Sequence, residues 1–586
     1  MAASAEATHN PRRNPRSTGE AGEVAARAAG NAVVDATAIA SYRFGRNPSI
    51  LQSGECPVNF ASRPLVFLFV LLSLAPSALF LWQHSDLPSF GDLHDDSLYY
   101  VSAKSLADGG AYRIESLPGE PSQTKYPPLY PLLLSLAWRM NSEFLQNLPI
   151  AAWISWLAFP AIMLQLVWVF PRLGIAGWRA WMLMLLVAVN PYMLVFSSTL
   201  VSELSYTALM LAAMLLTERA TRASAIAAGT VAGLAYLTRS AGIVFLVAGP
   251  LYLWMRHKHR EAVLWACAML PFVAGWTVWT RLHQVPTSDP ALIYYTDYLR
   301  YELYSISLHD LPVFVWKNID GLLLGLGSLV LPNVASSFIF KTVAQVIAIA
   351  MISGVVRMIR RGAMGSGMVQ LYALLAAGSC AQLVVWHFPP NERFVLPFLP
   401  LAVAGLMTEM EHLSAMLRKG LQHRDASQRV VAAGMLLAVS CVLVGAVGLQ
   451  IYVGQVLLPE QETAHRVANA DRIASYDWIR TKLPQDATLL SSEDALLYLN
   501  TGRHAIRRTL PPPYWYREDH ARIIDWMSNF RTFGQEHGLT YLAFTGVDFR
   551  QGITDDDRDA IAKAIRSSPD LSPMYQTETA TVYRLR

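Results

Sequence analysis

The sequence predicts a polytopic α-helical membrane protein with about eleven transmembrane helices and a small extracytoplasmic α/β domain at its C-terminal end. Only 15% of the 586 residues are charged and 53% are hydrophobic, whereas a soluble domain averages about 25% charged residues. Apolar runs recur from residue 64 to residue 452. After residue 460 charged residues become frequent, and helical and strand-like segments alternate.

The first 60 residues are rich in Ala, Asn, Ser and Arg and contain no apolar run. We expect residues 1–60 to form a disordered cytoplasmic tail and not a cleaved signal peptide. The net charge of +4 is small, so nothing indicates a nucleic-acid partner. No cysteine follows residue 441, so the C-terminal region has no disulfide framework.

A helix needs roughly 20 apolar residues to cross the hydrocarbon core of a membrane. Two apolar stretches, 126–140 and 321–331, are short and marked by Pro or Gly, and we expect them to lie on the surface or to enter the membrane and return. The predicted spans are 64–82, 148–170, 180–196, 203–218, 223–238, 240–255, 261–281, 336–356, 367–386, 394–411 and 430–452.

The distribution of arginine predicts the orientation, because cytoplasmic loops carry an excess of Lys and Arg. With eleven spans, the arginine-rich tail and all the short basic loops lie in the cytoplasm; if 126–140 crossed the membrane, four of these loops would lie outside. The expected arrangement is a transmembrane domain at 61–455 in the plasma (inner) membrane. It places the large loops 83–147 and 282–335, the turn 387–393 and the domain 460–586 on the extracytoplasmic side.

Within the C-terminal region, residues 465–482 are expected to form an amphipathic helix, and Thr488–Ser492 and Thr540–Phe544 to form short strands. The run Thr554–Asp557 is typical of a capped helix start. The chain has no internal repeat, so an inverted-repeat transporter is not supported.

Ionisable side chains from six segments share the outer face in this arrangement, and such residues near a membrane are candidates for function. The second large loop adds Tyr294, Tyr295, Asp297 and Arg300. The candidate site residues are Asp95, Asp96, Tyr99, Lys125, Glu203, Arg239, His387 and Arg393.

Structural alternatives exist for several of these residues. Asp92 or Asp95 could cap the helix expected near residue 95, and Lys125 could extend to the membrane interface. Glu203 could likewise cap its helix, and Arg239 could bind lipid headgroups. The helix from residue 95 is amphipathic, and we expect its apolar side to lie on the membrane.

Carboxylates and cations together at a lipid interface suit one type of reaction. A carboxylate can remove a proton from an acceptor hydroxyl, while cations hold a lipid phosphate and stabilise it as it leaves. The sequence has no phosphate-binding Gly-rich loop in a suitable context and no zinc-spaced Cys/His cluster. A divalent cation bridging the first-loop acids and a donor phosphate stays an open alternative.

The first large loop resembles a known signature. Its residues 95–109 (DDSLYYVSAKSLADG) and 125–129 (KYPPL) resemble the first loop of the GT-C fold membrane glycosyltransferases, above all the protein O-mannosyltransferases and the lipid A aminoarabinose transferases. The resemblance covers about residues 60–452. Further similar segments are Ser202-Glu203, Gly233–Arg239 and Arg393–Pro400.

The resemblance implies a hexosyl- or pentosyltransferase that moves a sugar from a polyprenyl-phosphate donor to an acceptor hydroxyl on a lipid, a glycan or a protein. The family's acidic pair falls on Asp95 and Asp96, although its second acid is often Glu. The Lys-Pro-Pro segment falls on Lys125, Pro127 and Pro128, with Tyr126 inserted. These matches predict Asp95, or else Asp96, as the general base.

The remaining candidates are expected to bind the donor phosphate or the substrate, and a direct attack on the anomeric carbon predicts inversion of configuration. Two alternatives remain at this point. One is a ligase or polymerase that moves whole lipid-linked glycans. The other is a transporter or flippase for lipid-linked sugars, although its polar residues should lie near the bilayer midplane.

Overall fold

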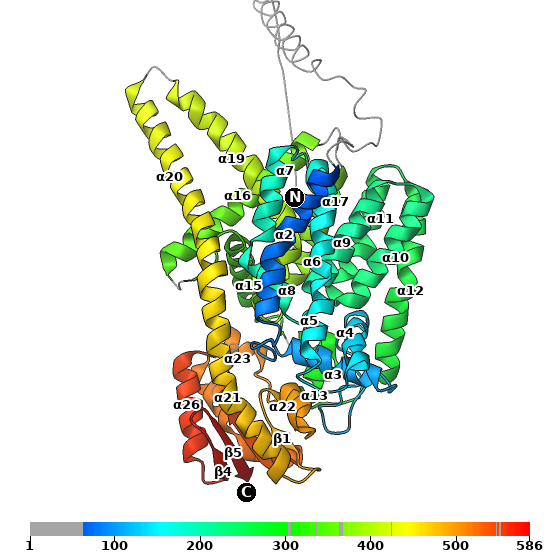
Figure 1. The fold of residues 1–586 in the computed structure, drawn as a ribbon, viewed down its shortest axis with the longest axis vertical. Coiled ribbons are helices and arrows are strands. Elements are labelled where there is room, and N and C mark those ends of the chain that lie inside the picture. The colour runs from blue at the N-terminus through cyan, green and yellow to red at the C-terminus, as the bar shows by residue number, and fades with distance from the viewer. Residues whose placement is uncertain are drawn as a thin grey trace, which may run out of the picture. The chain divides into compact units, whose positions relative to one another are not determined.

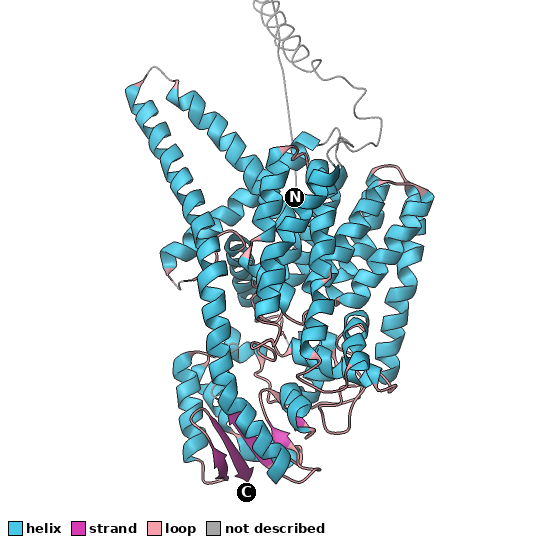
Figure 2. Ribbon diagram, viewed as in Figure 1, coloured by secondary structure: helices cyan, strands magenta, loops and turns pink. Residues whose placement is uncertain are grey.

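The computed structural model describes residues 63–302, 306–334, 337–362, 367–422, 425–545, 548–549 and 553–586. These residues belong to one compact unit. Within it the helices form a bundle and the strands gather at one end (Figures 1 and 2). The predicted tail, residues 1–60, lies outside the described residues.

All eleven segments predicted to span the membrane are helical. They correspond to α2 (Arg63–Gln83), α5 and α6 (Leu148–Trp156, Ala158–Arg172), α7 and α8 (Trp178–Ala188, Pro191–Ser198), α9 (Glu203–Glu218), α10 (Arg222–Thr238), η3 and α11 (Ser240–Val244, Phe245–Met255), α12 (His259–His283), α16 (Phe338–Gly362), α17 (Gly367–Val384), α18, η4 and α19 (Glu392–Val395, Leu396–Phe398, Leu399–Leu421) and α20 (Ala426–Tyr452).

Seven of the described helices are long and apolar enough to cross a membrane, or eight if the bent pair α7–α8 is one span. The chain is therefore an integral membrane protein. The 52° bend between α7 and α8 has a local cause: Pro191 has no N–H with which to continue α7, and the Asn190 side chain caps the new helix by accepting from the amides of Tyr192 and Met193. Because α9, α10 and η3–α11 are shorter, the count of eleven stays a prediction.

The two large loops are helical as well, but none of the helices that the structure describes in them qualifies as a span. The first loop contains α3 (Asp95–Ala107) and α4 (Leu129–Met140), and the second contains α13 (Pro290–Thr296), α14 (Tyr298–Glu302) and α15 (Leu311–Ser328). The apolar side chains of α3 do not lie on a membrane surface as expected. Leu98, Tyr99 and Val101 are at most 3% exposed and pack inside the protein.

Glycines let the helices that carry the site approach one another closely. A Cβ on Gly229 of α10 would lie 2.2 Å from the carbonyl oxygen of Trp265 on α12, and one on Gly233 would lie 2.3 Å from the ring of Phe272. Close backbone contact through small residues is typical of helix packing in membranes. Here it holds α12 beside the end of α10, where the chain continues into Arg239.

The C-terminal region carries a five-stranded sheet with strand order β2-β1-β3-β5-β4. β1 pairs in parallel with β2 and β3, whereas β5 pairs antiparallel with β3 and β4. The strands are β1 (Leu489–Leu490), β2 (Ala505–Ile506), β3 (Tyr541–Thr545), β4 (Leu571–Gln576) and β5 (Ala580–Leu585). The two predicted strands overlap β1 and β3.

The helices of this region surround the sheet. α21 extends the line of α20 through a short π-helical turn, Val453–Leu457, and Thr554 caps α26 by accepting from the amide of Asp557 at 3.2 Å, as its sequence predicts. The helices are α21 (Leu458–Lys482), α22 (Asp494–Thr501), α23 (Pro512–Tyr516), α24 (His520–Ser528), α25 (Phe530–Glu536) and α26 (Asp555–Ser567).

One hydrophobic core joins this region to the first large loop. Tyr100 and Leu117 of the loop belong to the same cluster of buried side chains as Leu489, Leu497 and Ile506.

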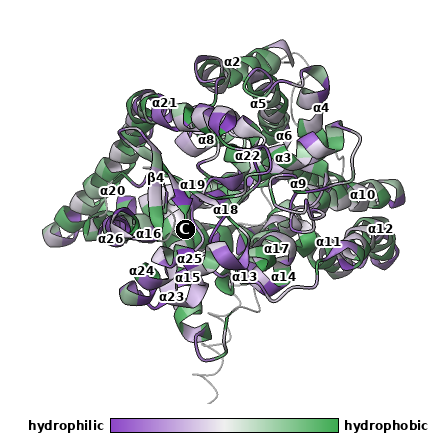
Figure 3. Cartoon of the chain, turned by 90° about the horizontal axis from the view of Figure 1, so that it is seen from below, coloured by the Kyte–Doolittle hydropathy of each residue, from purple (hydrophilic) through white to green (hydrophobic). Residues whose placement is uncertain are grey.

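Hydrophobic residues predominate on peripheral helices such as α20 (Figure 3), where Val430, Leu437 and Val444 are exposed. Side chains of this kind suit contact with lipid.

Candidate active site

A cavity of about 1210 Å³ is lined by residues of both large loops, the membrane helices and the C-terminal region. It brings together six of the eight candidate residues: Asp95, Tyr99, Lys125, Arg239, His387 and Arg393. Glu203 lies directly behind the wall, bound to two of the arginines. Asp96 does not line the cavity.

Four charged residues form what we call the Glu203 cluster: Asp95, Glu203, Arg239 and Arg393. Glu203 begins α9 and is fully buried. Its Oε1 atom accepts from Arg239 Nη1 at 2.8 Å and from Nε of Arg393. Arg393 Nη2 in turn lies 2.8 Å from Asp95 Oδ2. Because burying a charge is costly unless it is paired and hydrogen-bonded, each member depends on the others.

Local structure places the two arginines. Arg239 follows the last residue of α10, where the chain turns into a 3₁₀ helix. Arg393 lies in α18, whose start is capped by Asn391 through its side-chain oxygen and the Arg393 amide, 3.1 Å apart. Gly325 of α15 makes room for this cap, since a Cβ there would lie 2.9 Å from the Asn391 carbonyl carbon.

Asp95 faces the cavity, with about a quarter of its side chain exposed. The Tyr126 hydroxyl donates to Oδ1. Burial alone would raise the pKa of Asp95, but the charges of Arg393 and Lys125 and the bond from Tyr126 outweigh it and lower that pKa to about 2. Asp95 is therefore ionised at neutral pH.

Asp96 points away from the cavity and stabilises the turn before α3. Its Oδ2 accepts from the Gly91 amide at 2.9 Å and its Oδ1 from the Ser97 amide at 2.7 Å. Gly91 has φ +96°, and a Cβ there would lie 2.7 Å from Leu496. Burial raises the pKa of Asp96 to about 7 against the two amide bonds, which lower it.

Asp92 does not cap α3. The N-cap position of α3 is His94, and no side chain bonds there. Asp92 instead lies 3.1 Å from Nδ1 of His465 and 3.8 Å from Nη1 of Arg472, both on α21.

Lys125 is 5% exposed, so it does not extend to a membrane surface. Its Nζ lies 3.6 Å from the ring centroid of Tyr294 on α13, and farther from the rings of Tyr126 and Tyr301. The buried side chain of Gln123 holds the loop in this position, because its Oε1 accepts from the Lys125 amide at 3.0 Å.

His94 connects the site to the C-terminal region. Its Nε2 lies 2.7 Å from Asp494 Oδ1 and its Nδ1 lies 2.9 Å from the Tyr294 hydroxyl. Burial lowers the pKa of His94, although Asp494 opposes this. A neutral ring that donates from Nε2 to Asp494 accepts at Nδ1 from Tyr294, which orients the Tyr294 ring beside Lys125. We call His94, Lys125, Tyr294 and Asp494 the Tyr294 cluster.

Tyr99 and His387 complete the cavity wall. The Tyr99 hydroxyl lies 3.3 Å from Ser202 Oγ, which also accepts from Arg239 Nη1 at 3.3 Å. The His387 ring lies 5.1 Å from the Tyr301 ring, between their centroids.

Several residues of the site were not among the candidates. Tyr126 interrupts the family's Lys-Pro-Pro pattern, yet it donates to Asp95. His94 stands beside the acidic pair but has no distinctive spacing. Asp494 and Arg507 lie some 400 residues from Asp95 in the chain, and only the shared core of the first large loop and the C-terminal region brings them near. No local pattern could have identified those two.

A divalent cation does not fit between the first-loop acids. Asp95 faces the cavity and pairs with Arg393, whereas Asp96 is occupied by backbone amides. In the part of the chain that the structure describes, no group of three or more His, Cys, Asp or Glu side chains could hold a metal ion.

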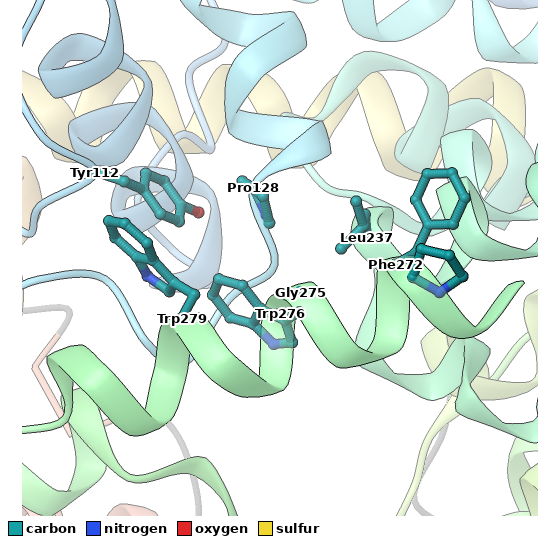
Figure 4. Close-up of a pocket in the computed structure, with 8 residues that line it drawn as sticks. Tyr112, Pro128, Leu237, Phe272, Gly275, Trp276 and Trp279 are labelled. Carbon is teal, nitrogen blue, oxygen red and sulfur yellow. The ribbon is translucent and has the colours of Figure 1, made fainter.

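A second, apolar cavity of about 430 Å³ adjoins the first, and Trp276 of α12 lines both. Aromatic rings of α12 and of the first large loop converge on it (Figure 4). Its lining residues are Tyr112, Pro128, Leu237, Pro271, Phe272, Gly275, Trp276 and Trp279.

No protein-family model and no curated protein sequence matches the chain. Solved structures similar to it include ArnT from Cupriavidus metallidurans bound to undecaprenyl phosphate, which is 13% identical over 89% of this chain and 98% of that chain, with a TM-score of 0.45. The archaeal oligosaccharyltransferase AglB from Archaeoglobus fulgidus, in complex with an inhibitory peptide and a dolichol-phosphate, is 11% identical over 83% of this chain and 70% of that chain, with a TM-score of 0.49.

The arabinofuranosyltransferase AftD from Mycobacteria is 14% identical over 89% of this chain and 40% of that chain, with a TM-score of 0.41. All three are GT-C fold membrane glycosyltransferases, the group that the first-loop residues resemble. With TM-scores below 0.5, the likeness is one of general arrangement.

Proposed function

We propose that this chain is a membrane glycosyltransferase that moves a sugar from a polyprenyl-phosphate donor to an acceptor hydroxyl, with Asp95 as the general base and inversion at the anomeric carbon. One observation carries the proposal. A single cavity contains an ionised carboxylate, Asp95, together with Lys125, Arg239 and Arg393, and it adjoins an apolar cavity.

The arginines and the lysine are assigned to the donor phosphate. Guanidinium groups bind phosphate oxygens through paired, charge-assisted hydrogen bonds. Glu203 holds Arg239 and Arg393 in place before the substrate arrives. As the bond between sugar and phosphate breaks, negative charge grows on the leaving phosphate, and cations that are already oriented stabilise it most effectively.

Asp95 is assigned to the acceptor hydroxyl. A carboxylate whose pKa is about 2 is a weak base, and its ion pair with Arg393 is the main reason for that low pKa. A phosphate bound to Arg393 would weaken this pair and add a negative charge nearby. Both effects raise the pKa of Asp95, so donor binding itself would activate the base.

The apolar cavity is assigned to the isoprenoid tail next to the phosphate. Phe272, Trp276 and Trp279 of α12 line this cavity with aromatic rings, which suit a branched hydrocarbon. The tail would then continue into the lipid along the exposed apolar side chains of the membrane helices.

The same proposal includes the arrangement expected from the arginine-bearing loops. The site would lie on the extracytoplasmic face of the plasma (inner) membrane, with residues 61–455 as the transmembrane domain and 460–586 as an extracytoplasmic α/β domain. The N-terminal tail, residues 1–60, would be cytoplasmic. A cysteine placed at an exposed position of α26 should react with an impermeant thiol reagent in intact cells, and labelling only after lysis would contradict this orientation.

The test of the activity is transfer of radiolabelled sugar from polyprenyl-phosphate donors in membranes that contain the full-length chain. Asp95→Asn should lower transfer by about 10²- to 10⁴-fold, because the amide cannot take a proton while it keeps the shape of the side chain. Asp108→Asn is the matched control, since Asp108 lies at the end of the same helix, 55% exposed and paired with Lys104. Near-normal transfer by Asp95→Asn at normal protein levels would contradict the assignment of Asp95 as the general base. Movement of the donor across the membrane without transfer would favour a flippase.

A further inference from the structure

Arg507 reaches the cavity from the C-terminal region. It follows β2 and lines the cavity wall together with Thr509, Leu510, Pro512 and Trp515. Its neighbour Arg508 is engaged elsewhere: Nη1 donates to the Asn529 carbonyl oxygen at 2.6 Å, and its guanidinium lies 4.7 Å from the Trp526 ring centroid. The segment after β2 therefore directs one of two adjacent arginines to the site.

The Arg507 side chain makes no hydrogen bond and no ion pair with any of the residues that the structure describes. Its charge acts on Tyr294, Tyr295 and the buried carboxylate of Asp494, which binds His94 through Oδ1 at 2.7 Å. A half-buried guanidinium of this kind is an anion-binding group whose capacity remains unused.

The charges around the cavity exceed what one phosphate requires. The lining cations are Lys125, Arg239, Arg281, Arg300, Arg393 and Arg507, and the lining carboxylates are Asp95 and Asp297. The buried carboxylates Glu203 and Asp494, which do not line the cavity, offset two further cations. A sugar phosphodiester brings a single negative charge, so positive charge would remain after the donor binds.

Arg507 reaches the cavity from a different part of the chain than the arginines assigned to the donor phosphate. Arg239 and Arg393 lie beside membrane helices and converge on Glu203, whereas Arg507 follows β2 of the C-terminal region. Arg507 is therefore not part of the Glu203 cluster.

We propose that Arg507 binds an anionic group, a phosphate or a carboxylate, on the acceptor, and that the C-terminal region thereby takes part in acceptor recognition. This inference rests on the proposed function, because it takes the Glu203 cluster as the site of the donor phosphate. Thr509 lines the same wall and offers a hydroxyl for the same group.

The experiment uses the full-length protein in lipid nanodiscs saturated with undecaprenyl phosphate. Binding of glycerol 1-phosphate, glycerate and neutral glycerol is then measured by calorimetry, so that the arms distinguish phosphate from carboxylate and charge from the hydroxyls. Arg507→Gln should weaken binding of the favoured anion about 10- to 100-fold, and Arg507→Lys should weaken it less. Arg531→Gln is the matched control, because Arg531 is exposed on α25 and pairs with Asp570.

Binding of undecaprenyl phosphate separates the outcomes. It should change by less than about twofold in Arg507→Gln, which also shows that the variant is folded. If both anions bind Arg507→Gln as they bind the wild type, or if neither binds the wild type more tightly than glycerol does, the inference is overturned and the proposed function stands. If Arg507→Gln loses undecaprenyl phosphate as well, Arg507 belongs to the donor site. A wild-type protein that binds no undecaprenyl phosphate would overturn the proposed function itself.

Discussion

The Glu203 cluster and the Tyr294 cluster hold their cations in different ways. In the first, two arginines converge on one fully buried carboxylate and one of them also pairs with Asp95. In the second, a lysine lies against an aromatic ring that a neutral histidine orients. From this difference we expect the loss of Glu203, the carboxylate shared by two arginines, to destabilise the fold more than the loss of Lys125 does.

The largest effect is expected when Glu203, the carboxylate shared by the two arginines, is removed. Glu203→Gln would leave two buried guanidiniums without their common partner, and we expect the free energy of unfolding to fall by about 3–5 kcal/mol. Chemical denaturation in detergent measures the change. The double variant Glu203→Gln/Arg239→Gln should recover part of the loss. An unchanged unfolding free energy for Glu203→Gln would show that the pairing does not stabilise the fold.

Asp96 is a control for the first cluster, because it is adjacent to Asp95 and its pKa is shifted in the opposite direction. Its pKa is about 7 in the folded protein against an ordinary 3.8, so the folded state binds this proton more tightly than the unfolded state does. Stability should therefore decline from about pH 4 to about pH 7, by at most about 4 kcal/mol, and level off above that. Asp96→Asn should flatten this slope in unfolding measurements at several pH values. A slope that persists in the variant would belong to another group.

The pH dependence that Asp95 gives to stability has the opposite sign. With its pKa lowered to about 2, the stability that it contributes is present above about pH 4 and is lost as the pH falls through about 2. Between pH 4 and pH 8 it adds no slope, so the Asp96 effect can be read without interference from its neighbour.

The second cluster is tested by its lysine. Lys125→Met should leave the unfolding free energy within about 1 kcal/mol but weaken binding of undecaprenyl phosphate about 10- to 100-fold, as expected for the loss of one charge-assisted contact. Lys125→Arg should retain part of the affinity. Should Lys125→Met destabilise the protein as much as Glu203→Gln does, the contrast between the clusters would disappear.

The smallest expected effect concerns the ring that holds this lysine. Tyr294→Leu removes the aromatic face and should weaken undecaprenyl phosphate binding about 3- to 30-fold, in line with a cation–π contact of about 0.5–2 kcal/mol. Tyr294→Phe keeps the face and loses only the bond to His94, so its effect should stay below about threefold. Equal effects of the two substitutions would assign the role to the hydroxyl and not to the ring.

The helical segments and their local starts could be predicted because they depend on neighbouring residues. The eleven apolar runs predicted to span the membrane are all helical, and Thr554 identified the start of α26. The number of spans is harder to predict from the sequence, because α9 and α10 are short and whether a short helix crosses the membrane depends on its neighbours. The placement of α3 on a membrane was wrong because its apolar side chains pack against α4 and the C-terminal region, which local amphipathicity does not reveal.

The sequence alone determined which residue types were available for the site: an acidic pair, a lysine before two prolines, and arginines at helix ends that share one face. Tertiary structure decided how they combine. Asp95 and Asp96 are adjacent in the chain, yet successive residues of a helix point in different directions, so one faces the cavity and the other supports a turn. Arg393 and Arg507, which line the cavity, and Glu203 and Asp494, which bind side chains at its wall, come from distant segments. Only the packing of the helices and the shared core brings them together.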